Sequence, residues 1–225
     1  DAAIYIRGNS KNNNYNNSQD IIYHVDSSDY SVSKWDDYSW TVTDDYGNNW
    51  ESTLGTQNTS NLVVHENSNS YITFRNDDQL YGQGNKGAFL VSSPDHDGFV
   101  VNSSNFKLDL SQAEVVPLSA DDTYLAVWRM IDPDNETPYG ENEDAYIRVF
   151  DSAGNFLTDE TSLAGLGIDY DYEYETIMDV QTLSNGDAAI YIRGNSKNNN
   201  YNNSQDIIYH VDSSDYSVSK WDDYS

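Results

Sequence analysis

Short apolar runs alternate with polar turns along the whole chain, and no stretch has the apolar spacing of a long helix. Four of these runs share the form of a β-type strand that ends in arginine; they are 3–7, 71–75, 125–129 and 189–193. The last three follow a polar turn, and another apolar run precedes that turn, at 62–64, 115–118 and 177–180. Apolar runs bounded by turn residues predict antiparallel strands joined by hairpins.

A third and a fourth strand are expected to complete each unit. The third follows a variable loop, at 21–25, 88–91 and 145–149. The turn at 151–155 then leads to a short fourth run at 156–157. The predicted fold class is therefore all-β, built from repeated four-stranded antiparallel blade-like modules. One such sheet cannot bury both of its faces alone, so the modules must stack, in a closed ring or in an open series.

Residues 1–39 recur without change as residues 187–225, which gives the chain a period of 186 residues. Even the polar loop at 9–17 is identical, although packing does not require it. This identity indicates a tandem array of long repeats; the alternative is a chain deliberately extended past one period. We therefore expect both ends of the chain to lie inside a longer protein. The expected modules are 1–59, which lacks its first strand, 60–112, 113–175, and 176–225, which begins the next repeat.

The charge of the chain belongs to the repeat. The sequence has 38 acidic and 11 basic side chains, a net charge of −27, and no cysteine. The second copy of the 39-residue segment holds six acids and three bases, which leaves −24 for one period. A chain this acidic is repelled by nucleic acid and by anionic lipid, so we expect neither nucleic-acid binding nor membrane insertion. The absence of cysteine excludes disulfides and thiolate metal sites.

Two segments, LSNGDAAIYIRG at 183–194 and DAYIRVFDSAGNFL at 144–157, resemble the blade repeats of β-propeller-like modules in very long secreted bacterial surface proteins. In that family a strand pair around L-x-x-G leads to a hairpin around F-D-x-x-G-N. The resemblance covers most of 114–195 and, more loosely, 60–108. It implies a propeller-like architecture and an extracellular or cell-surface location. Closed propellers use about four to eight blades, so three blades per period imply either a ring made from two periods or an open stack.

One acidic segment has the spacing of oxygen ligands for calcium. With Asp132 as position 1 of a calcium loop, Asp134, Glu136 and Glu143 occupy positions 3, 5 and 12. Position 6 is Thr137 rather than glycine, and no helix is expected on either side. The alternative is a polar loop between two strands. Ca²⁺ is the one cofactor that the sequence suggests.

Two further acidic segments need an explanation. Residues 93–98 place Asp95 and Asp97 as in the middle of a D-x-D-x-D-G calcium loop, for which a plain turn is the alternative. Residues 169–175 alternate acids with tyrosines. If extended, this stretch puts four carboxylates on one face. We expect a solvated edge strand whose charge blocks unwanted pairing, with divalent cations screening the row.

The tryptophans and the sequons suggest glycan contacts. Trp40 and Trp50 flank an additional hairpin at 44–49 and are the candidates for stacking on sugar rings. Trp128 lies inside an apolar strand and is expected in the core. Five N-x-S/T sequons are expected in surface loops, where a glycosylating host would modify them; they are Asn16, Asn58, Asn102, Asn135 and Asn202.

No arrangement of residues in the sequence indicates catalysis. There is no cysteine nucleophile, no G-x-S-x-G elbow and no H-E-x-x-H motif, so we expect no enzyme. The sequence predicts an extracellular tandem-repeat structural or adhesive protein: a fibre, filament or stalk, rigidified by calcium, whose partners are neighbouring copies or its own repeats, and glycans. Two alternatives remain open, a lectin-like carbohydrate-binding propeller and a propeller-type polysaccharide hydrolase or lyase.

Overall fold

A computed structural model of the chain describes residues 2–9, 18–26, 28–38, 40–43, 49–52, 61–65, 70–77, 88–93, 96–102, 107–119, 122–137, 140–166, 174–195 and 204–224. Within these residues the chain is all-β, apart from one short 3₁₀ helix, η1 (Ala164–Leu166). The predicted fold class is confirmed at this level. No helix in the described part of the chain has the length and apolar character needed to cross a bilayer.

Seventeen strands follow one another in the described residues. They are β1 (Ala2–Asn9), β2 (Ser18–Val25), β3 (Val32–Tyr38), β4 (Trp40–Thr43), β5 (Asn49–Ser52), β6 (Asn61–His65), β7 (Ser70–Asp77), β8 (Ala88–Ser93), β9 (His96–Val100), β10 (Lys107–Pro117), β11 (Thr123–Thr137), β12 (Gly140–Asp151), β13 (Thr161–Ser162), β14 (Tyr174–Thr182), β15 (Ala188–Asn195), β16 (Ser204–Val211) and β17 (Val218–Tyr224).

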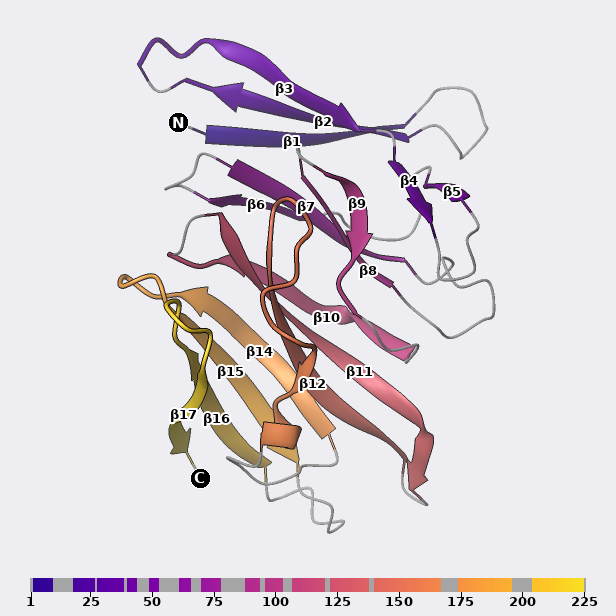
Figure 1. Cartoon of the computed structure of the whole chain (residues 1–225), viewed down its shortest axis with the longest axis vertical. Helices are drawn as coiled ribbons and strands as arrows, with labels where there is room; N and C mark the ends of the chain where they lie inside the picture. Colours follow the sequence, from indigo (N-terminus) through magenta and orange to yellow (C-terminus); the bar gives the residue numbers. More distant parts are fainter. Residues whose placement is uncertain are drawn as a thin grey trace.

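The strands pair with their neighbours in the sequence, as a meander requires (Figure 1). Four-stranded antiparallel sheets form twice, as β6–β9 and as β14–β17, and β10, β11 and β12 form a third meander to which β13 adds. A single parallel pair, Glu143 opposite Tyr174, joins β12 to β14 and links the two meanders at their edges into one eight-stranded sheet. The faces of these two meanders pack against each other around a shared core, so we describe β10–β12 and β14–β17 as two stacked sheets. β1–β3 and the β4–β5 hairpin are separate sheets. Within the described residues the sheets do not close into a barrel or a propeller ring.

The β10–β12 sheet is apolar on both faces, because alternate residues of its central strand β11 enter different cores. Leu125 and Val127 belong to a cluster shared with β14–β17, whereas Tyr124, Ala126 and Trp128 belong to a cluster shared with β6–β9. All five are fully buried. The expectation that each sheet must stack on its neighbours is confirmed for this sheet, and so is the core position of Trp128.

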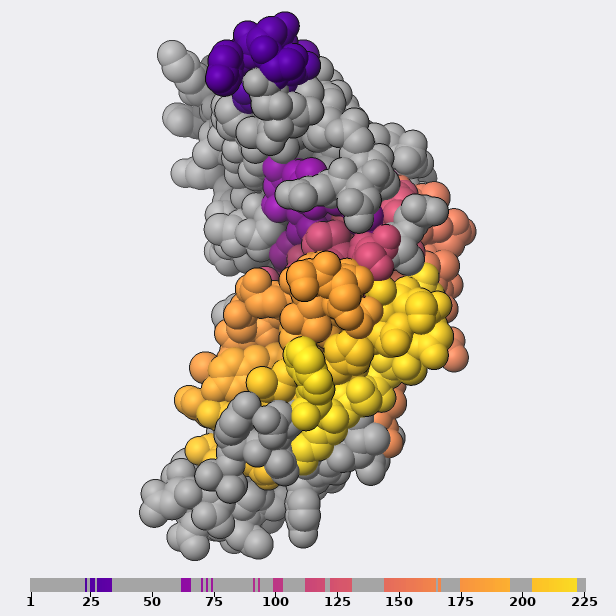
Figure 2. Space-filling view, turned by 90° about the vertical axis from the view of Figure 1, so that its left-hand side faces the viewer, coloured from indigo at the N-terminus to yellow at the C-terminus, as the bar shows by residue number. Residues whose placement is uncertain are grey.

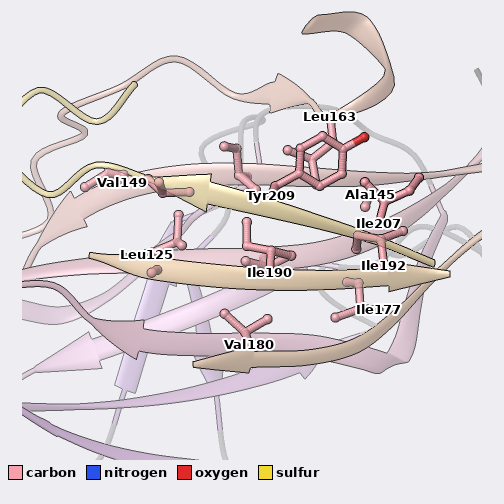
Figure 3. Packing of buried hydrophobic residues seen from close by; sticks show 14 of the residues in the cluster. Leu125, Ala145, Val149, Leu163, Ile177, Val180, Ile190, Ile192, Ile207 and Tyr209 are labelled. Atoms are coloured by element: carbon pink, nitrogen blue, oxygen red, sulfur yellow. The ribbon is translucent and has the colours of Figure 1, made fainter. Parts of the chain in front are cut away.

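Each of the two cores is built from branched aliphatic and aromatic side chains. The first, between β10–β12 and β14–β17, is shown in Figure 3 and contains Leu118, Leu125, Val127, Ala145, Ile147, Val149, Leu163, Ile177, Val180, Ala188, Ile190, Ile192, Ile207, Tyr209 and Val211. The second contains Ile72, Phe74, Val91, Val101, Val115, Tyr124, Ala126, Trp128, Met130 and Phe150. Burial of one such large side chain stabilises the fold by roughly 1.5–3 kcal/mol, so sheet stacking supplies much of the stability.

The two identical segments adopt the same fold. β1–β3 and β15–β17 share one register, with Ala2 opposite Val25 in the first copy and Ala188 opposite Val211 in the second. A register shift interrupts the second strand pair at the same place in both copies. The sequence of the segment therefore determines its hairpins, whatever surrounds it.

The turn between the last two strands of each copy shows how local this control is. The carboxylate of Asp26 accepts the backbone N–H two residues later at 2.7 Å, and that of Asp212 does so at 2.8 Å. Tyr30 and Tyr216 both adopt a left-handed conformation, with φ of 59° and 60°. A bulky residue rarely adopts this conformation, and the aspartate side chains that brace the turn explain why it occurs twice.

Candidate functional site

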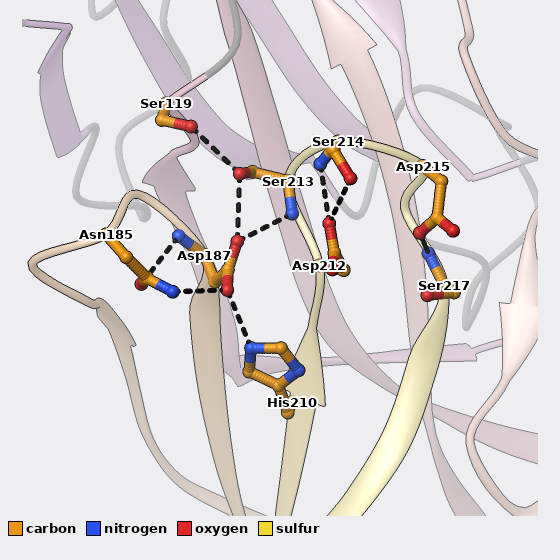
Figure 4. Close-up of polar contacts among 9 residues, drawn as sticks. All are labelled: Ser119, Asn185, Asp187, His210, Asp212, Ser213, Ser214, Asp215 and Ser217. Atoms are coloured by element: carbon orange, nitrogen blue, oxygen red, sulfur yellow. Dashed lines mark hydrogen bonds and ion pairs between the residues drawn. The ribbon is translucent and has the colours of Figure 1, made fainter.

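The most highly organised polar group in the described residues fastens β14–β17 to β10–β12 (Figure 4). Asp187, 8% exposed, lies at its centre. Its Oδ1 accepts the backbone N–H and the hydroxyl of Ser213, both at 2.9 Å. Its Oδ2 accepts Asn185 Nδ2 at 2.6 Å and His210 Nε2 at 2.8 Å. The Ser213 hydroxyl accepts in turn from Ser119 Oγ, 2.8 Å away on the neighbouring sheet. We call these residues the Asp187 junction.

The electrostatics of this junction favour the charged carboxylate. The backbone N–H of Ser213 is the largest cause, and the Ser213 hydroxyl, His210 and Asn185 act in the same direction. Together they outweigh partial desolvation and hold the pKa of Asp187 at about 2, below its ordinary value of 3.8. Hydrogen bonds to the ionised form lower a carboxyl pKa in this way. The junction therefore contains a fixed negative charge at neutral pH.

Ser213, His210 and Asp187 have the composition of a nucleophilic triad but not its geometry. In a triad the imidazole lies between the hydroxyl and the carboxylate, so that it can take the hydroxyl proton. Here the carboxylate lies in the middle, because it accepts both the Ser213 hydroxyl and His210 Nε2. The serine proton points at a weak base, and the hydroxyl is not activated. The arrangement can hold two sheets together, and it gives no support to the hydrolase alternative.

Gly186 brings the two sheets into close contact beside the junction. Its φ is +87°, a conformation that other residues rarely adopt. Its carbonyl accepts the backbone N–H of Ser119 at 2.9 Å. A Cβ added at Gly186 would lie 1.8 Å from Ser119 Cβ. The G in the L-x-x-G motif is therefore required twice, by the turn and by the neighbouring sheet.

Gly186→Ala is expected to lower the free energy of unfolding by about 2 kcal/mol or more, from backbone strain and from the contact with Ser119. Urea unfolding at pH 7 measures the loss. The same substitution in a Ser119→Gly background should cost less, because the contacting Cβ is gone. An equal cost in both backgrounds would contradict the close contact.

A second polar group joins β6–β9 to the other face of the β10–β12 sheet. Asp122 accepts the Ser70 hydroxyl on one carboxylate oxygen and the Ser152 hydroxyl on the other. The Tyr124 hydroxyl lies 2.7 Å from Ser70 Oγ and donates to it, because the serine proton is directed at Asp122. Burial, the largest cause, raises the pKa of Tyr124 far above its usual range. We call these residues the Asp122 junction.

Two more residues, His65 and Ser93, extend the Asp122 junction along the same edge. His65 is 1% exposed, and its Nε2 donates to the Leu118 carbonyl at 2.6 Å. Its ring packs edge-on against Tyr124 with a centroid distance of 5.7 Å. The Ser93 hydroxyl donates to the Ser152 carbonyl. Each sheet interface therefore combines an apolar core with a polar fastening at the strand ends.

The serines of these junctions were missed by the sequence analysis, although a signal exists. Ser93, Ser152 and Ser213 occupy equivalent places at the end of the third strand of three modules or just after it, in the strings VSS, FDS and VDS. All three are buried, with exposures of 1%, 1% and 7%. A small hydroxyl that recurs after an apolar strand indicates a repeated contact, and aligning the modules through 93, 152 and 213 would have found it.

The expectation for the acidic stretch 169–175 is wrong where the structure tests it. Glu175, in β14, is fully buried rather than solvated. Its Oε2 accepts the backbone N–H of Ala145 at 2.8 Å, so it links β14 to β12. Its backbone carbonyl accepts Arg129 Nη1 at 3.4 Å. β14 also pairs along its length with β15. Residues 167–173 lie outside the described residues.

The predicted calcium ligands near 132 fall on a β-hairpin rather than in a continuous loop. β11 runs to Thr137 and β12 begins at Gly140, with Asp132 opposite Asn142 and Glu136 opposite Glu141. The ladder is irregular between Asp132 and Glu136. The side chains of Asp132, Asp134, Glu136 and Glu143 lie outside what the structure describes, so calcium binding stays a prediction. In the described residues no group of three or more His, Asp or Glu side chains could hold a metal ion.

The remaining candidate residues are placed only in part. Asp95 lies outside the described residues, and Asp97 falls in β9, where Ser93 pairs with His96. The hairpin between Trp40 and Trp50 is present as β4 and β5, with Trp40 opposite Ser52 and Val42 opposite Trp50. The indole positions are not described.

The sequons differ in what the structure says of them. Asn102 is 3% exposed, so a glycan on its side chain would require local opening of the fold. Asn135 lies in β11, where its side chain is not described. Asn16, Asn58 and Asn202 lie outside the described residues.

Glu114 in β10 and Asp179 in β14 form a pair of neighbouring carboxylates. Partial burial and the neighbouring charge of Asp179 raise the pKa of Glu114. Both side chains are exposed on strands at the surface. A general acid needs an enclosed, apolar setting to hold its proton near neutral pH. This pair is a point of repulsion between strands and lacks that setting.

No known protein family, curated protein or solved structure matches the chain. A proposal for its function therefore rests on the sequence and the geometry of the chain itself.

Proposed function

We propose that the chain is part of an extracellular tandem-repeat structural or adhesive protein, a fibre, filament or stalk made of stacked propeller-like sheets. The supporting observation is that the β10–β12 sheet is covered on both faces by neighbouring sheets of the same chain. A sheet that uses both faces for stacking is an internal member of a series. A repeated sequence can continue such a series without a new kind of interface.

The polar chemistry of the described residues supports the same function. Both carboxylate oxygens of Asp122 and of Asp187 accept hydrogen bonds from adjacent sheets or turns. Groups committed in this way hold elements together and are not free to react. Each period also has a net charge of −24. Like charge keeps neighbouring molecules soluble and apart, which suits a long chain of identical units.

Chains of one, two and four periods, imaged by negative-stain electron microscopy, test the proposal. An open stack predicts a longest dimension that grows in proportion to the number of periods. Small-angle scattering of the same samples provides an independent longest dimension. A particle that stays compact as periods are added would contradict the proposal of a fibre. A ring that closes with two periods would show a closed propeller instead of an open stack.

The proposal includes calcium as a stiffening ion, held by Asp132, Asp134, Glu136 and Glu143 with Asp95 and Asp97 as a second set. Thermal unfolding with 2 mM calcium, on the order of the affinity of extracellular calcium modules, and with excess EDTA tests this part. Calcium binding predicts a higher midpoint in calcium, lost in Asp134→Asn. An unchanged midpoint would contradict the calcium part of the proposal and would leave the part that concerns stacked sheets unaffected.

Carbohydrate binding is the second candidate, and one observation favours it. The β4–β5 hairpin forms its own two-stranded sheet and contains both Trp40 and Trp50. A hairpin outside the stacked sheets is a suitable place for a sugar platform. A glycan array that includes microbial polysaccharides tests it, with Trp40→Ala and Trp50→Ala expected to abolish any hit. An array without hits would contradict carbohydrate binding and would leave the structural function as the sole proposal.

A further inference from the structure

The two copies of the 39-residue segment have the same fold but different surroundings. Tyr216 and Val218, in the second copy, pack against the core shared with β10–β12. Their sequence equivalents in the first copy, Tyr30 and Val32, are 81% and 61% exposed. Figure 2 shows the described residues around 30 at one end of the molecule, away from the second copy. Two large apolar side chains on one turn and strand are thus uncovered in one copy only.

The same difference continues onto the strand before the turn. Tyr209 and Val211 are fully buried in the second copy, whereas Tyr23 and Val25 are only partly buried in the first. The registers of the strands are identical. The difference in exposure therefore comes from the neighbours and not from the fold of the segment.

One edge of the segment differs as well. In the second copy β15 pairs along its length with β14, from Tyr174 opposite Asn195 to Thr182 opposite Ala188. In the first copy β1, which has the sequence of β15, pairs with β2 and is the edge strand of its sheet among the described residues. A free strand edge is a template for an added strand.

We infer that the first copy is a docking surface for the part of another period that covers the second copy. The surface, hereafter the docking face, consists of Tyr23, Val25, Tyr30, Val32 and the free edge of β1. Its occupant is residues 107–186 of a preceding period: their β10–β12 sheet would cover the apolar side chains, and their β14 would pair with β1. This deepens the proposed function, on which it rests, by naming the surfaces that join one period to the next.

The second copy shows why this occupant fits. Leu118, Leu125 and Val127 contribute the facing core. The turn Gly186–Asp187 and the Ser119–Ser213 contact form the polar fastening. Residues 1–39 repeat 187–225, so a preceding period would present the same donors and apolar groups to Asp1 and its neighbours. Two unlike surfaces meet in this contact, so it propagates head to tail.

The chain has no cysteine, which allows a thiol reporter free of background. We would place one cysteine at Val32 or at Val218 of the full chain and measure labelling by an aromatic disulfide reagent. The two sites have identical sequence neighbours, so intrinsic thiol reactivity is matched. In the full chain Val32→Cys should react about fivefold or more faster than Val218→Cys, because its site is uncovered. Equal rates would overturn the difference between the copies.

The decisive measurement uses a longer chain, with one complete extra period, 1–186, placed before Asp1. The segment then occurs three times, and the reporter replaces the equivalent of Val32 in the first or in the second occurrence. We expect fast labelling in the first and slow labelling, at the rate of Val218→Cys, in the second. Fast labelling in both would overturn the docking face. Circular dichroism of each variant verifies that the sheets are intact.

The outcome is separable from that of the proposed function. If the reporter is protected but the chains image as compact particles, the docking face is supported and the proposal of a fibre is contradicted. An unprotected reporter in chains that image as fibres would do the opposite, because the periods would then be joined without this contact.

Discussion

Trp128→Ala is expected to lower the free energy of unfolding by about 3–5 kcal/mol, one of the two largest effects of any single substitution proposed for this chain. Trp128 is fully buried and belongs to the core between β10–β12 and β6–β9. Its ring stacks on Tyr146 with a centroid distance of 6.3 Å. Truncation removes the apolar contacts of the ring and leaves a cavity in this core.

Trp221→Ala is the matched control, because Trp221 is 59% exposed in β17 and contacts His210 at its ring. The same truncation there should change stability by roughly 0.5 kcal/mol or less, as surface substitutions do. Urea unfolding followed by far-ultraviolet circular dichroism measures both without relying on tryptophan fluorescence. A loss for Trp128→Ala no larger than that for Trp221→Ala would mean that the two sheets do not depend on this contact.

The meanders could be predicted from sequence because their causes are local. The β14–β15 hairpin depends on LSNG, where Gly186 takes the left-handed position and Leu183 N–H pairs with the Asp187 carbonyl at 2.7 Å. The turns after Val25 and Val211 depend on aspartates that bond two residues later. Every one of these interactions spans a few residues, so turn chemistry and apolar alternation are enough to find them.

The recurring serines carry a sequence signal, but their partners in the junctions could not be predicted, because those partners are distant in the sequence. Ser119 meets Ser213 across 94 positions, and Ser70 meets Asp122 across 52. Glu175 illustrates the same limit: its alternating acidic neighbours indicate a solvated strand, yet its carboxylate is needed by Ala145 N–H, 30 residues earlier. The hydrogen-bond partners of a buried polar residue are the groups that sheet stacking places beside it. The order in which the sheets stack cannot be inferred from a short stretch of sequence.

These buried acids change what the net charge means. Asp187 and Glu175 are largely covered and bonded, so they fasten sheets, whereas acids such as Asp212 and Asp215 serve turns at the surface. Composition alone counts them as one class. The acidic residues of the repeat therefore serve two purposes. Buried acids hold the sheets together, and replacing them with basic residues would destroy these contacts. Acids at the surface control solubility.

Asp187→Ala is expected to destabilise the chain by about 2–4 kcal/mol, because it leaves several donors in a nearly closed site without their acceptor. Asp212→Ala is the control: its carboxylate also accepts two bonds, from Ser214 N–H at 2.8 Å and Ser214 Oγ at 2.6 Å, but at an exposed turn where water replaces it. Urea unfolding at pH 7 compares them. Equal losses would show that the Asp187 junction contributes nothing beyond an ordinary turn.

The pH dependence of stability gives the same residue a second, independent signature. The folded pKa of Asp187 is about 2 and its ordinary value is 3.8, so the folded state favours the carboxylate. Its contribution is therefore fully present above about pH 4, and it is lost as the pH falls toward 2. Between pH 6 and pH 2.5 the wild-type chain should lose more stability than Asp187→Ala, which has no carboxyl to protonate there. Asp212→Ala should keep the acid-dependent loss that Asp187 causes, because it retains that carboxylate. If Asp187→Ala and the wild type lost equal stability over this range, the hydrogen bonds of Ser213, Asn185 and His210 would not be holding a charged carboxylate.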